Sequence, residues 1–196
     1  MKKIPSIFVR DWDGDRRFVL NERNPVCQWV FDGEGHATRK WDGTSCKVDN
    51  GELFARYDYK KKSRDKGNKP PMGWGPCQPE PDEKSGHWPG WVHTENAPNN
   101  KYHKEFQEEA KTLPDGTYEL CGPKVGTNPE GFDKRRLLLH GGKGLAPPAR
   151  DYETLTQFFT ENPMEGIVFH HPDGRMAKIK ARDLNVEWPR ENKEKK

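Results

Sequence analysis

An Asn-Gly pair at residues 50 and 51 constrains the fold more than any other local feature of this chain. It separates two short runs, the partly β-branched Thr44–Val48 and Leu53–Tyr57. Asn-Gly is the preferred centre of a two-residue hairpin turn, because both residues tolerate a positive φ. We therefore predict an antiparallel strand pair here, within a region from residue 16 to 57 that is rich in strands. A further short strand is expected at Thr38–Trp41.

Beyond the hairpin, the pattern alternates between strands and helices. One helix is predicted from about Lys101 to Lys111, capped by Asn99 or Asn100, and another at Tyr152–Glu161, capped by Asp151. Strands are predicted at 117–121, 136–140 (buried), 166–170 and 176–180, the last two joined by the turn at 172–174. This order predicts an α+β fold of antiparallel sheets with flanking helices.

The segment from Lys60 to Asn100 has no hydrophobic period and is dominated by Lys, Pro, Gly and Trp. We interpret it as a long loop or insertion, and such loops inside compact domains are often functional. Since 196 residues suit one domain, we expect a single domain over residues 1–190. The insertion would lie at about 60–100, and the charged tail 191–196 is expected to be disordered.

Composition restricts the class of protein. Only 31% of the residues are apolar and the net charge is +3, so any nucleic-acid binding requires local clusters of cations. The four cysteines are far apart, which favours a reducing compartment. Cys77, His87 and His93 match no familiar zinc spacing. No apolar stretch resembles a signal peptide or a membrane span, so we expect a soluble cytoplasmic or otherwise intracellular protein without a membrane partner or an obligate protein partner.

The segment Arg39–Ser45 carries the most chemical information. It places Lys40 between two strands and beside Asp42 and Gly43. A lysine is a nucleophile only after losing its proton, which desolvation or nearby positive charge promotes. Lys178 and Lys180 would share one face of a strand, where they suit a phosphate and would lower the pKa of a facing lysine.

Two acids, Glu119 and Glu165, lie at strand edges. They would suit a ribose hydroxyl or a divalent cation, since carboxylates are usual ligands of magnesium. Each of these motifs has a plainer interpretation: a KxDG match by chance, a solvated KxK strand, or surface acids in salt bridges. Their joint order along the chain carries the argument.

In that order the motifs resemble the covalent nucleotidyltransferase superfamily of DNA ligases, RNA ligases and mRNA capping enzymes. The resemblance implies an ATP-grasp-like adenylation domain in which Lys40 accepts the nucleotide within the KxDG motif. It also implies that ATP is bound by a set of further residues. Arg56 and Glu119 would contact the ribose, and Lys178 and Lys180 the α-phosphate. Glu165 would be the metal-associated glutamate of EGxV. The others in the set are Arg39, Asp42 and Gly43. Glu165 and Glu119 are the expected metal ligands, for Mg²⁺ or Mn²⁺.

The stretches LFARYDYKK, GTYELCGPKVGTNPEG and EGIVFHHPDG further resemble a stand-alone family of 5′-to-3′ RNA ligases. For the aromatic residue that stacks on adenine, Phe132 and His140 are both candidates, and a structural role for His140 is an open alternative. DNA ligases and capping enzymes continue into an oligonucleotide-binding barrel. This sequence stops at residue 196, too soon after Lys180 for such a barrel, so we expect none and favour an RNA ligase.

RNA would be held by cations and aromatic side chains in the 60–100 segment. The candidates are Lys60, Lys61, Lys62, Arg64 and Trp74, with Trp88 and Trp91 in the same loop. Cations for phosphates and aromatic faces for unstacked bases together make a single-strand binding surface. The alternative is a solvated loop whose tryptophans pack onto the domain. The group Lys134–Arg136 is a weaker candidate.

The resemblance thus implies an ATP-dependent RNA ligase that joins 5′-phosphate and 3′-hydroxyl RNA ends through a lysyl-AMP and an adenylylated RNA 5′ end. Two alternatives stay open. One is a DNA-joining ligase of the same superfamily, and the other is a catalytically silent RNA-binding module.

Overall fold

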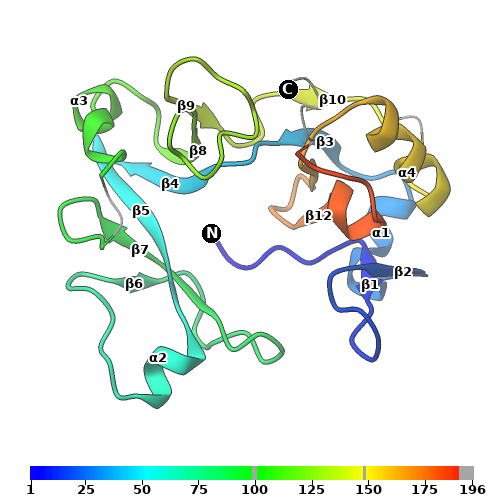
Figure 1. Ribbon diagram of the computed structural model, residues 1–196, viewed down its shortest axis with the longest axis horizontal. Helices are drawn as coiled ribbons and strands as arrows, with labels where there is room; N and C mark the ends of the chain where they lie inside the picture. Colours follow the sequence, from blue (N-terminus) through cyan, green and yellow to red (C-terminus); the bar gives the residue numbers. More distant parts are fainter. Residues whose placement is uncertain (99–100, 148, 190–196) are drawn as a thin grey trace, which may run out of the picture. The chain divides into compact units, whose positions relative to one another are not determined.

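The computed structural model describes residues 1–98, 101–147 and 149–189 (Figure 1). Within them the named strands pair antiparallel, in open sheets of two, four and six strands without a closed barrel. The predicted combination of helices and antiparallel sheets is therefore confirmed. The chain forms two compact units. Unit 1 comprises Met1–Lys3 and Gly43–Leu139, and unit 2 comprises Ile4–Asp42 and the described residues from His140 onward. The single domain over 1–190 stays a prediction.

Unit 1 is built on the six-stranded sheet, with the strand order β6-β7-β5-β4-β8-β9. Its strands are β4 (Thr44–Asp49), β5 (Glu52–Tyr59), β6 (Gly75–Pro76), β7 (Trp88–His93), β8 (Gly116–Cys121) and β9 (Arg136–Leu139). Its helical segments are α2 (Lys61–Asp65), the 3-10 turn η2 (Lys104–Phe106) and α3 (Gln107–Ala110).

The predicted hairpin joins β4 to β5. Asn50 and Gly51 have φ values of 51° and 76°, as a two-residue turn of this kind requires. The amide of Asn50 donates a hydrogen bond to Oδ1 of Asp115 at 2.8 Å. The turn thereby sets the register of the two strands that lie at the centre of this sheet.

The segment expected as a loop at 60–100 contains regular structure. Its strand β7 pairs along β5, with Tyr59 opposite Trp88 and Phe54 opposite His93. The sequence Trp-Pro-Gly-Trp has no alternation of polar and apolar residues that would predict a strand. It is extended because it pairs with β5. The prediction of a loop over the whole segment is therefore wrong for β7. The residues between α2 and β7 are largely irregular, as predicted.

Two other predictions in unit 1 need correction. The helix expected at 101–111 is limited to η2 and α3, and its capping by Asn99 or Asn100 lies outside the described residues. The strand β9 was expected to be buried. It is instead an edge strand whose Arg136 and Leu139 are exposed, because β8 is its one neighbour among the strands that the structure describes.

Unit 2 contains the four-stranded sheet, with the order β10-β3-β11-β12, and the small β1-β2 pair. Its strands are β1 (Phe8–Arg10), β2 (Val19–Arg23), β3 (His36–Lys40), β10 (Gly144–Leu145), β11 (Gly166–His170) and β12 (Met176–Lys180). Its helical segments are η1 (Pro25–Cys27), α1 (Gln28–Phe31), α4 (Tyr152–Glu161) and η3 (Ala181–Leu184). The positions of α4, β11 and β12 agree with the sequence prediction.

One face of the four-stranded sheet is apolar and forms the core of unit 2. Ile167, Phe169 and Ile179 point to this face and belong to one buried cluster with Leu155 and Phe159 of α4. The alternate residues of the same strands point to the opposite face, because side chains alternate along a strand. That opposite face carries the polar residues described below.

Within the region 16–57, which was expected to form strands, residues 25–31 are helical. Asn24 caps η1, and its side chain accepts a hydrogen bond from the amide of Val26 at 3.3 Å. Pro25 then occupies the first helical position, which suits its fixed φ and its missing N–H. The sequence Asn-Pro is thus a helix start in this context.

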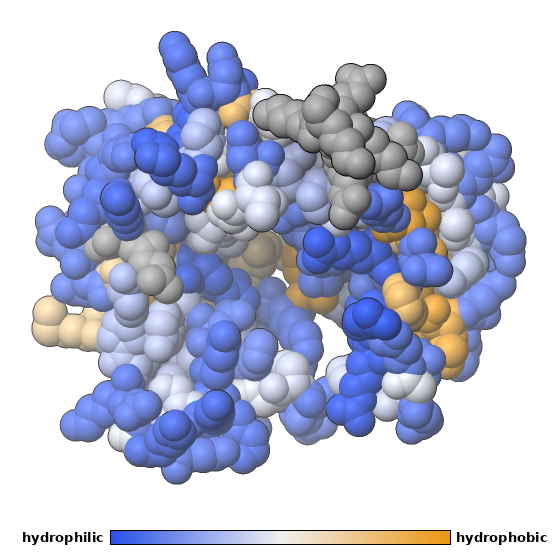
Figure 2. Space-filling model, in the orientation of Figure 1, coloured by the Kyte–Doolittle hydropathy of each residue, from blue (hydrophilic) through white to orange (hydrophobic). Residues whose placement is uncertain are grey.

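Hydrophilic side chains dominate the face shown in Figure 2, in line with the low apolar content. Among the described residues, no helix has the length and apolar character needed to cross a membrane. The tail at 191–196, expected to be disordered, lies outside the described residues.

We predict that Phe159→Ala destabilises the chain by about 3–5 kcal/mol, because it removes a large side chain that is 1% exposed in the core of unit 2. Urea unfolding followed by tryptophan fluorescence measures this. Gln157→Ala, at an exposed position of the same helix, should change the free energy of unfolding by less than about 0.5 kcal/mol. Equal effects of the two variants would contradict the assigned core.

Candidate active site

The polar face of the unit 2 sheet brings the predicted lysines together. Gly166 of β11 lies directly between Lys40 of β3 and Lys180 of β12 in the strand register. Two residues further along, Val168 lies between Thr38 and Lys178. Lys40, Lys178 and Lys180 therefore project from the same face, as the spacing predicted for the last two. We call this surface the Lys40 face.

Glu165 connects two of these lysines. Its Oε2 accepts a hydrogen bond from Nζ of Lys40, and its Oε1 accepts one from Nζ of Lys180 at 2.5 Å. The Glu165 side chain is 9% exposed and that of Lys40 22%. A carboxylate this well covered requires such partners, since an unpaired buried charge is very unfavourable. Glu165 and the two lysines thus form one ion-pair cluster.

The charges in the cluster shift the pKa values of its members. Burial alone would raise the pKa of Glu165, but Lys40 and Lys180 together lower it below its usual value. Burial, joined by the positive charges of Lys180 and Lys40, lowers the pKa of Lys178 to about 8. The Lys40 face therefore holds an ionised carboxylate and a lysine that loses its proton unusually easily.

Gly166 is required by close packing within the sheet. A Cβ atom at this position would lie 2.2 Å from the carbonyl oxygen of Ile179, far inside van der Waals contact. Only glycine fits, and its missing side chain leaves the space between Lys40 and Lys180 open. Glu165, the preceding residue, reaches both ammonium groups at this point.

Asp42 of the KxDG motif has a specific partner. Its Oδ2 accepts a hydrogen bond from the indole Nε1 of Trp188 at 2.7 Å. Asp183, just after β12, also has specific partners. It forms an ion pair with Arg10 at 2.8 Å and accepts a hydrogen bond from the backbone amide of Lys180 at 3.2 Å. Trp188, Asp183 and Arg10 were not predicted from the sequence. Only the proximity of Asp183 to the KxK motif offered a signal.

Arg39 and His140 also belong to unit 2. The side chain of Arg39 leaves β3 on the face opposite to that of Lys40, because side chains alternate along a strand. Its guanidinium lies 4.7 Å from the ring centroid of Trp41. His140 lies close enough to His170 to help lower the pKa of that imidazole, after burial and His36. The predicted roles of Arg39 and His140 in ATP binding stay predictions.

In unit 1, Arg56 and Glu119 lie on the face of the sheet opposite its core. Glu119 is paired with Ser45 in the register, one residue away from the buried pair Cys46 and Tyr118. Arg56 alternates with the buried Ala55, and its guanidinium donates to the carbonyl of Met1 at 2.7 Å and to Asp58 at 3.0 Å. The two candidates thus share one polar face.

Gly43, the residue after Asp42, lies in unit 1 very close to the backbone of Leu120. A Cβ atom there would lie 2.2 Å from the carbonyl oxygen of Leu120. Glycine is therefore needed at this position for packing of the chain after Asp42, whatever else it contacts. Phe132, the other candidate for stacking on adenine, is covered by the guanidinium of Arg136 at 4.4 Å from its ring centroid.

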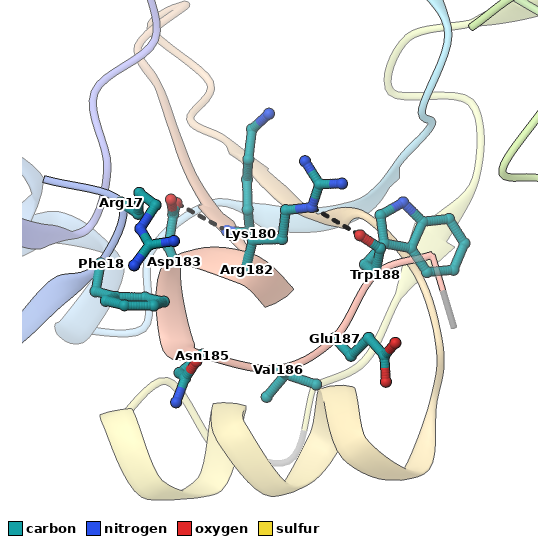
Figure 3. Close-up of a pocket in the computed structure, with 9 residues that line it drawn as sticks. All are labelled: Arg17, Phe18, Lys180, Arg182, Asp183, Asn185, Val186, Glu187 and Trp188. Atoms are coloured by element: carbon teal, nitrogen blue, oxygen red, sulfur yellow. Dashed lines mark hydrogen bonds between the residues drawn. The ribbon is translucent and has the colours of Figure 1, made fainter. Parts of the chain in front are cut away.

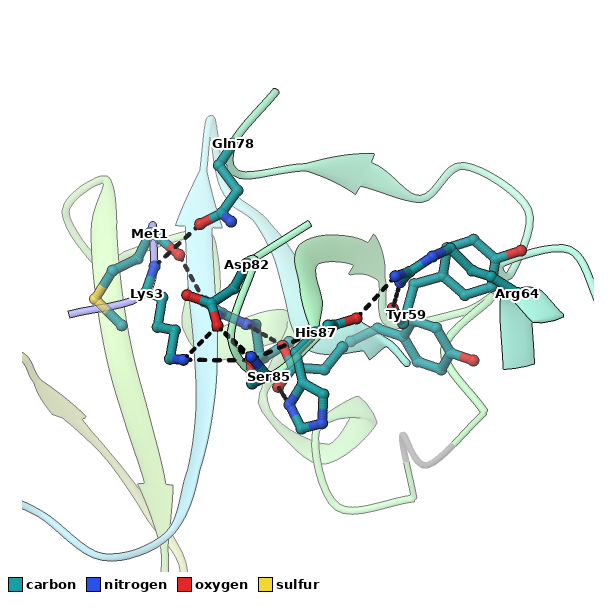
Figure 4. Close-up of polar contacts among 12 residues, drawn as sticks. Met1, Lys3, Tyr59, Arg64, Gln78, Asp82, Ser85 and His87 are labelled. Atoms are coloured by element: carbon teal, nitrogen blue, oxygen red, sulfur yellow. Dashed lines mark hydrogen bonds and ion pairs between the residues drawn. The ribbon is translucent and has the colours of Figure 1, made fainter. Parts of the chain in front are cut away.

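The RNA-binding candidates separate into two groups. Lys60, Lys61 and Lys62 are all exposed at the start of α2. In contrast, Arg64 donates to the carbonyls of Tyr59 and Gly86 (Figure 4). Trp74 donates to the carbonyl of Tyr57 at 3.3 Å and packs edge-on against Trp88 and Tyr59. The contacts of Arg64 and Trp74 favour the packing alternative for those two residues.

A divalent cation would find one suitable ligand in the cluster. Glu165 is a carboxylate on the Lys40 face, and Mg²⁺ is commonly bound by one or two carboxylates together with substrate phosphates. The part of the chain that the structure describes contains no group of three or more metal-ligating side chains. This includes the region of Cys77, His87 and His93. A cation beside Glu165 would therefore take its other ligands from outside the described side chains, as oxygen atoms of water or of a bound phosphate.

Comparison with known proteins confirms the resemblance to RNA ligases. A family described as RNA ligase 1 matches residues 104–196. RNA ligase 1 of Rattus norvegicus is 28% identical in an alignment of 270 positions that covers 96% of this chain and 82% of that protein. RNA ligase 1 of Danio rerio is 30% identical in an alignment of 146 positions that covers 57% of this chain and 44% of that protein. The matched family segment contains Glu165, Lys178 and Lys180.

We predict that Lys178→Met stabilises the chain at pH 7 and that this gain shrinks as the pH rises from about 8 toward 10.5. The folded-state pKa of Lys178 is lowered from 10.5 to about 8. Below pH 8 the ammonium is charged in both states, so its lost hydration and its repulsion by Lys40 and Lys180 weaken folding in full. Above pH 8 the folded state loses the proton first, and stability rises with pH.

Urea unfolding of the wild type and the variant at pH 7 and pH 9.5 measures the difference. Lys111→Met, at an exposed lysine of unit 1, is the control and should show no such dependence. A gap between wild type and Lys178→Met that is the same at both pH values would contradict the lowered pKa.

Proposed function

We propose that this chain, a relative of the RNA ligase 1 proteins, is an ATP-dependent RNA ligase that carries AMP on Lys40 and has an ATP-grasp-like adenylation fold. The observation that supports this most is the cluster on the Lys40 face. There a lysine from a KxDG motif contacts Glu165 of an EGxV motif, which also contacts Lys180 of a KxK motif. A chance KxDG sequence would have no reason to lie against the other two motifs.

In the first step, the neutral amine of Lys40 attacks the α-phosphorus of ATP. A P–N bond forms and the P–O bond to pyrophosphate breaks. The nitrogen of Lys40 gives one proton to solvent when the neutral amine forms and a second when the phosphoramidate forms, and one N–H remains. The positive charges of Lys178 and Lys180 favour the neutral form of Lys40. The same two side chains stabilise the negative charge that spreads over the phosphate oxygens in the transition state.

Glu165 stays ionised while it is paired, because Lys40 and Lys180 outweigh burial and lower its pKa. Its negative charge then opposes loss of the proton from the neighbouring Lys40. Lys40 therefore becomes a nucleophile when phosphate oxygens engage Lys180 and the pair with Glu165 opens. Glu165 would then hold Mg²⁺ or Mn²⁺ together with the phosphates. Such an ion, when bound, neutralises phosphate charge.

The remaining ATP contacts follow the resemblance. Arg56 and Glu119 bind the ribose, and the polar face that they share in unit 1 supports this. Glu119 is also a second candidate metal ligand. In the later steps AMP passes from Lys40 to the 5′-phosphate of an RNA, and a 3′-hydroxyl then displaces AMP to seal the strand.

We predict that Lys40→Ala abolishes covalent labelling by α-labelled ATP with Mg²⁺, read by denaturing electrophoresis, because the proposed nucleophile is removed. Lys111→Ala, at an exposed lysine with a partner in Glu108, should label like the wild type. Label that persists in Lys40→Ala would contradict the proposal. A wild type that takes no label should be examined by mass spectrometry for AMP already bound to Lys40.

We predict that replacing Lys60, Lys61 and Lys62 together by alanine weakens binding of single-stranded RNA. The slope of log affinity against log salt should fall by up to about 2, since each neutralised phosphate of a single strand accounts for about 0.7 of that slope. Fluorescence anisotropy of a labelled oligoribonucleotide at several salt concentrations measures this.

The control for this variant replaces Lys104, Lys111 and Lys124 together, which removes the same charge elsewhere in unit 1. An unchanged slope in the first variant would exclude Lys60–Lys62 from RNA binding. Nicked DNA offered in place of RNA in a ligation assay tests the DNA-joining alternative.

A further inference from the structure

A pocket of about 560 Å³ adjoins the Lys40 cluster within unit 2 (Figure 3). Its lining joins the end of β12 and the segment that follows to the loop before β2. The lining residues are Arg17, Phe18, Lys180, Arg182, Asp183, Asn185, Val186, Glu187 and Trp188. Its volume falls in the range of about 300–1,000 Å³ that is usual for pockets that bind small molecules. Because Lys180 belongs to both, the pocket opens directly beside the proposed site of AMP transfer.

The pocket combines cations with acids that are largely paired. Lys180 pairs with Glu165, and the buried Asp183 pairs with Arg10 at 2.8 Å. Arg182 donates through Nε to the carbonyl of Trp188 at 2.7 Å. In Figure 3 its guanidinium and the Lys180 side chain extend in the same direction from the backbone. Glu187, an exposed acid, is the remaining negative charge in the lining.

Two aromatic residues border the same pocket, and in Figure 3 they lie at opposite sides of it. Trp188 is buried and is held by its hydrogen bond to Asp42. Phe18 is only partly buried, and the guanidinium of Arg17 lies 5.3 Å from its ring centroid. The side chain of Arg17 is 80% exposed, and its guanidinium forms an ion pair with both carboxylate oxygens of Asp15. An aromatic face beside arginines is the combination that binds an unstacked base together with its phosphate.

We infer that this pocket binds the 5′-terminal nucleotide of the RNA, with its base on Phe18 and its 5′-phosphate near Arg17, Arg182 and Lys180. The inference rests on the proposed function and specifies where the second substrate is held. In the transfer, an oxygen of the RNA 5′-phosphate attacks the phosphorus of lysyl-AMP. The P–N bond to Lys40 breaks, and the departing amine takes up a proton. Phe18 and Arg17 then act on RNA transfer and have no contact with ATP.

The test separates loading of Lys40 from transfer to RNA. The full chain is loaded with α-labelled ATP and then mixed with a 5′-phosphorylated oligoribonucleotide in a single turnover. For Phe18→Ala and for Arg17→Ala we expect the half-saturating RNA concentration to rise about fivefold or more, in keeping with the usual effect of removing one stacking partner. The matched control is Arg16→Ala. Arg16 neighbours Arg17, lies outside the pocket lining and donates to the carbonyl of Trp12.

The inference is overturned if RNA transfer by Phe18→Ala and Arg17→Ala matches that of Arg16→Ala. It is also overturned if loading falls as much as transfer, since the pocket would then serve ATP or its pyrophosphate.

A second measurement does not depend on loading. Fluorescence anisotropy compares binding of 5′-phosphate and 5′-hydroxyl oligoribonucleotides to the unloaded chain. The wild type and Arg16→Ala should prefer the 5′-phosphate, and Arg17→Ala should lose that preference. Equal binding of both RNAs by the wild type overturns the pocket assignment. A wild type that prefers the 5′-phosphate but takes no label and carries no AMP by mass spectrometry would refute the proposed ligase while leaving the pocket assignment in place.

Discussion

The contact of one carboxylate with two lysines is the constraint on which the candidate site depends. Glu165 reaches both Lys40 and Lys180 only because β11 lies between β3 and β12 with Gly166 in register with both. A shift of one residue in either pairing would turn a lysine toward the opposite face. The buried apolar side chains on the other face of these strands prevent such a shift. The apolar core thus sets the geometry of the polar face.

This arrangement is electrostatically demanding. Three lysines on one sheet face repel one another, and Glu165 contacts two of them. Burial, joined by this repulsion, lowers the pKa of Lys178 to about 8. Polar clusters of this kind contribute little to stability, and strongly shifted pKa values are concentrated at functional sites. Under the proposed function, the same charges that weaken folding would favour a neutral lysine nucleophile and attract a phosphate.

Local sequence patterns predicted the elements that carry their own signals. The helix α4 has an Asp cap and a buried stripe, and β11 and β12 alternate around a Pro-Asp-Gly turn, so all three were located correctly. The strand β7 was missed because its sequence Trp-Pro-Gly-Trp has no period and depends on β5 to hold it extended. The exposure of β9 was also misjudged, since its apolar run says nothing about its place at the sheet edge.

The sequence by itself determined which residues are candidates for the proposed chemistry, because the order of Lys40, Glu165, Lys178 and Lys180 in short motifs is a property of the chain. It also determined the Asn50-Gly51 turn, a local conformational preference. Only the tertiary structure decided which side chains meet. Asp42 and Trp188 lie 146 residues apart and Arg10 pairs with Asp183, contacts that no local pattern encodes. It likewise separated the accessible Lys60–Lys62 from the packed Arg64 and Trp74, because burial depends on neighbours that are distant in sequence.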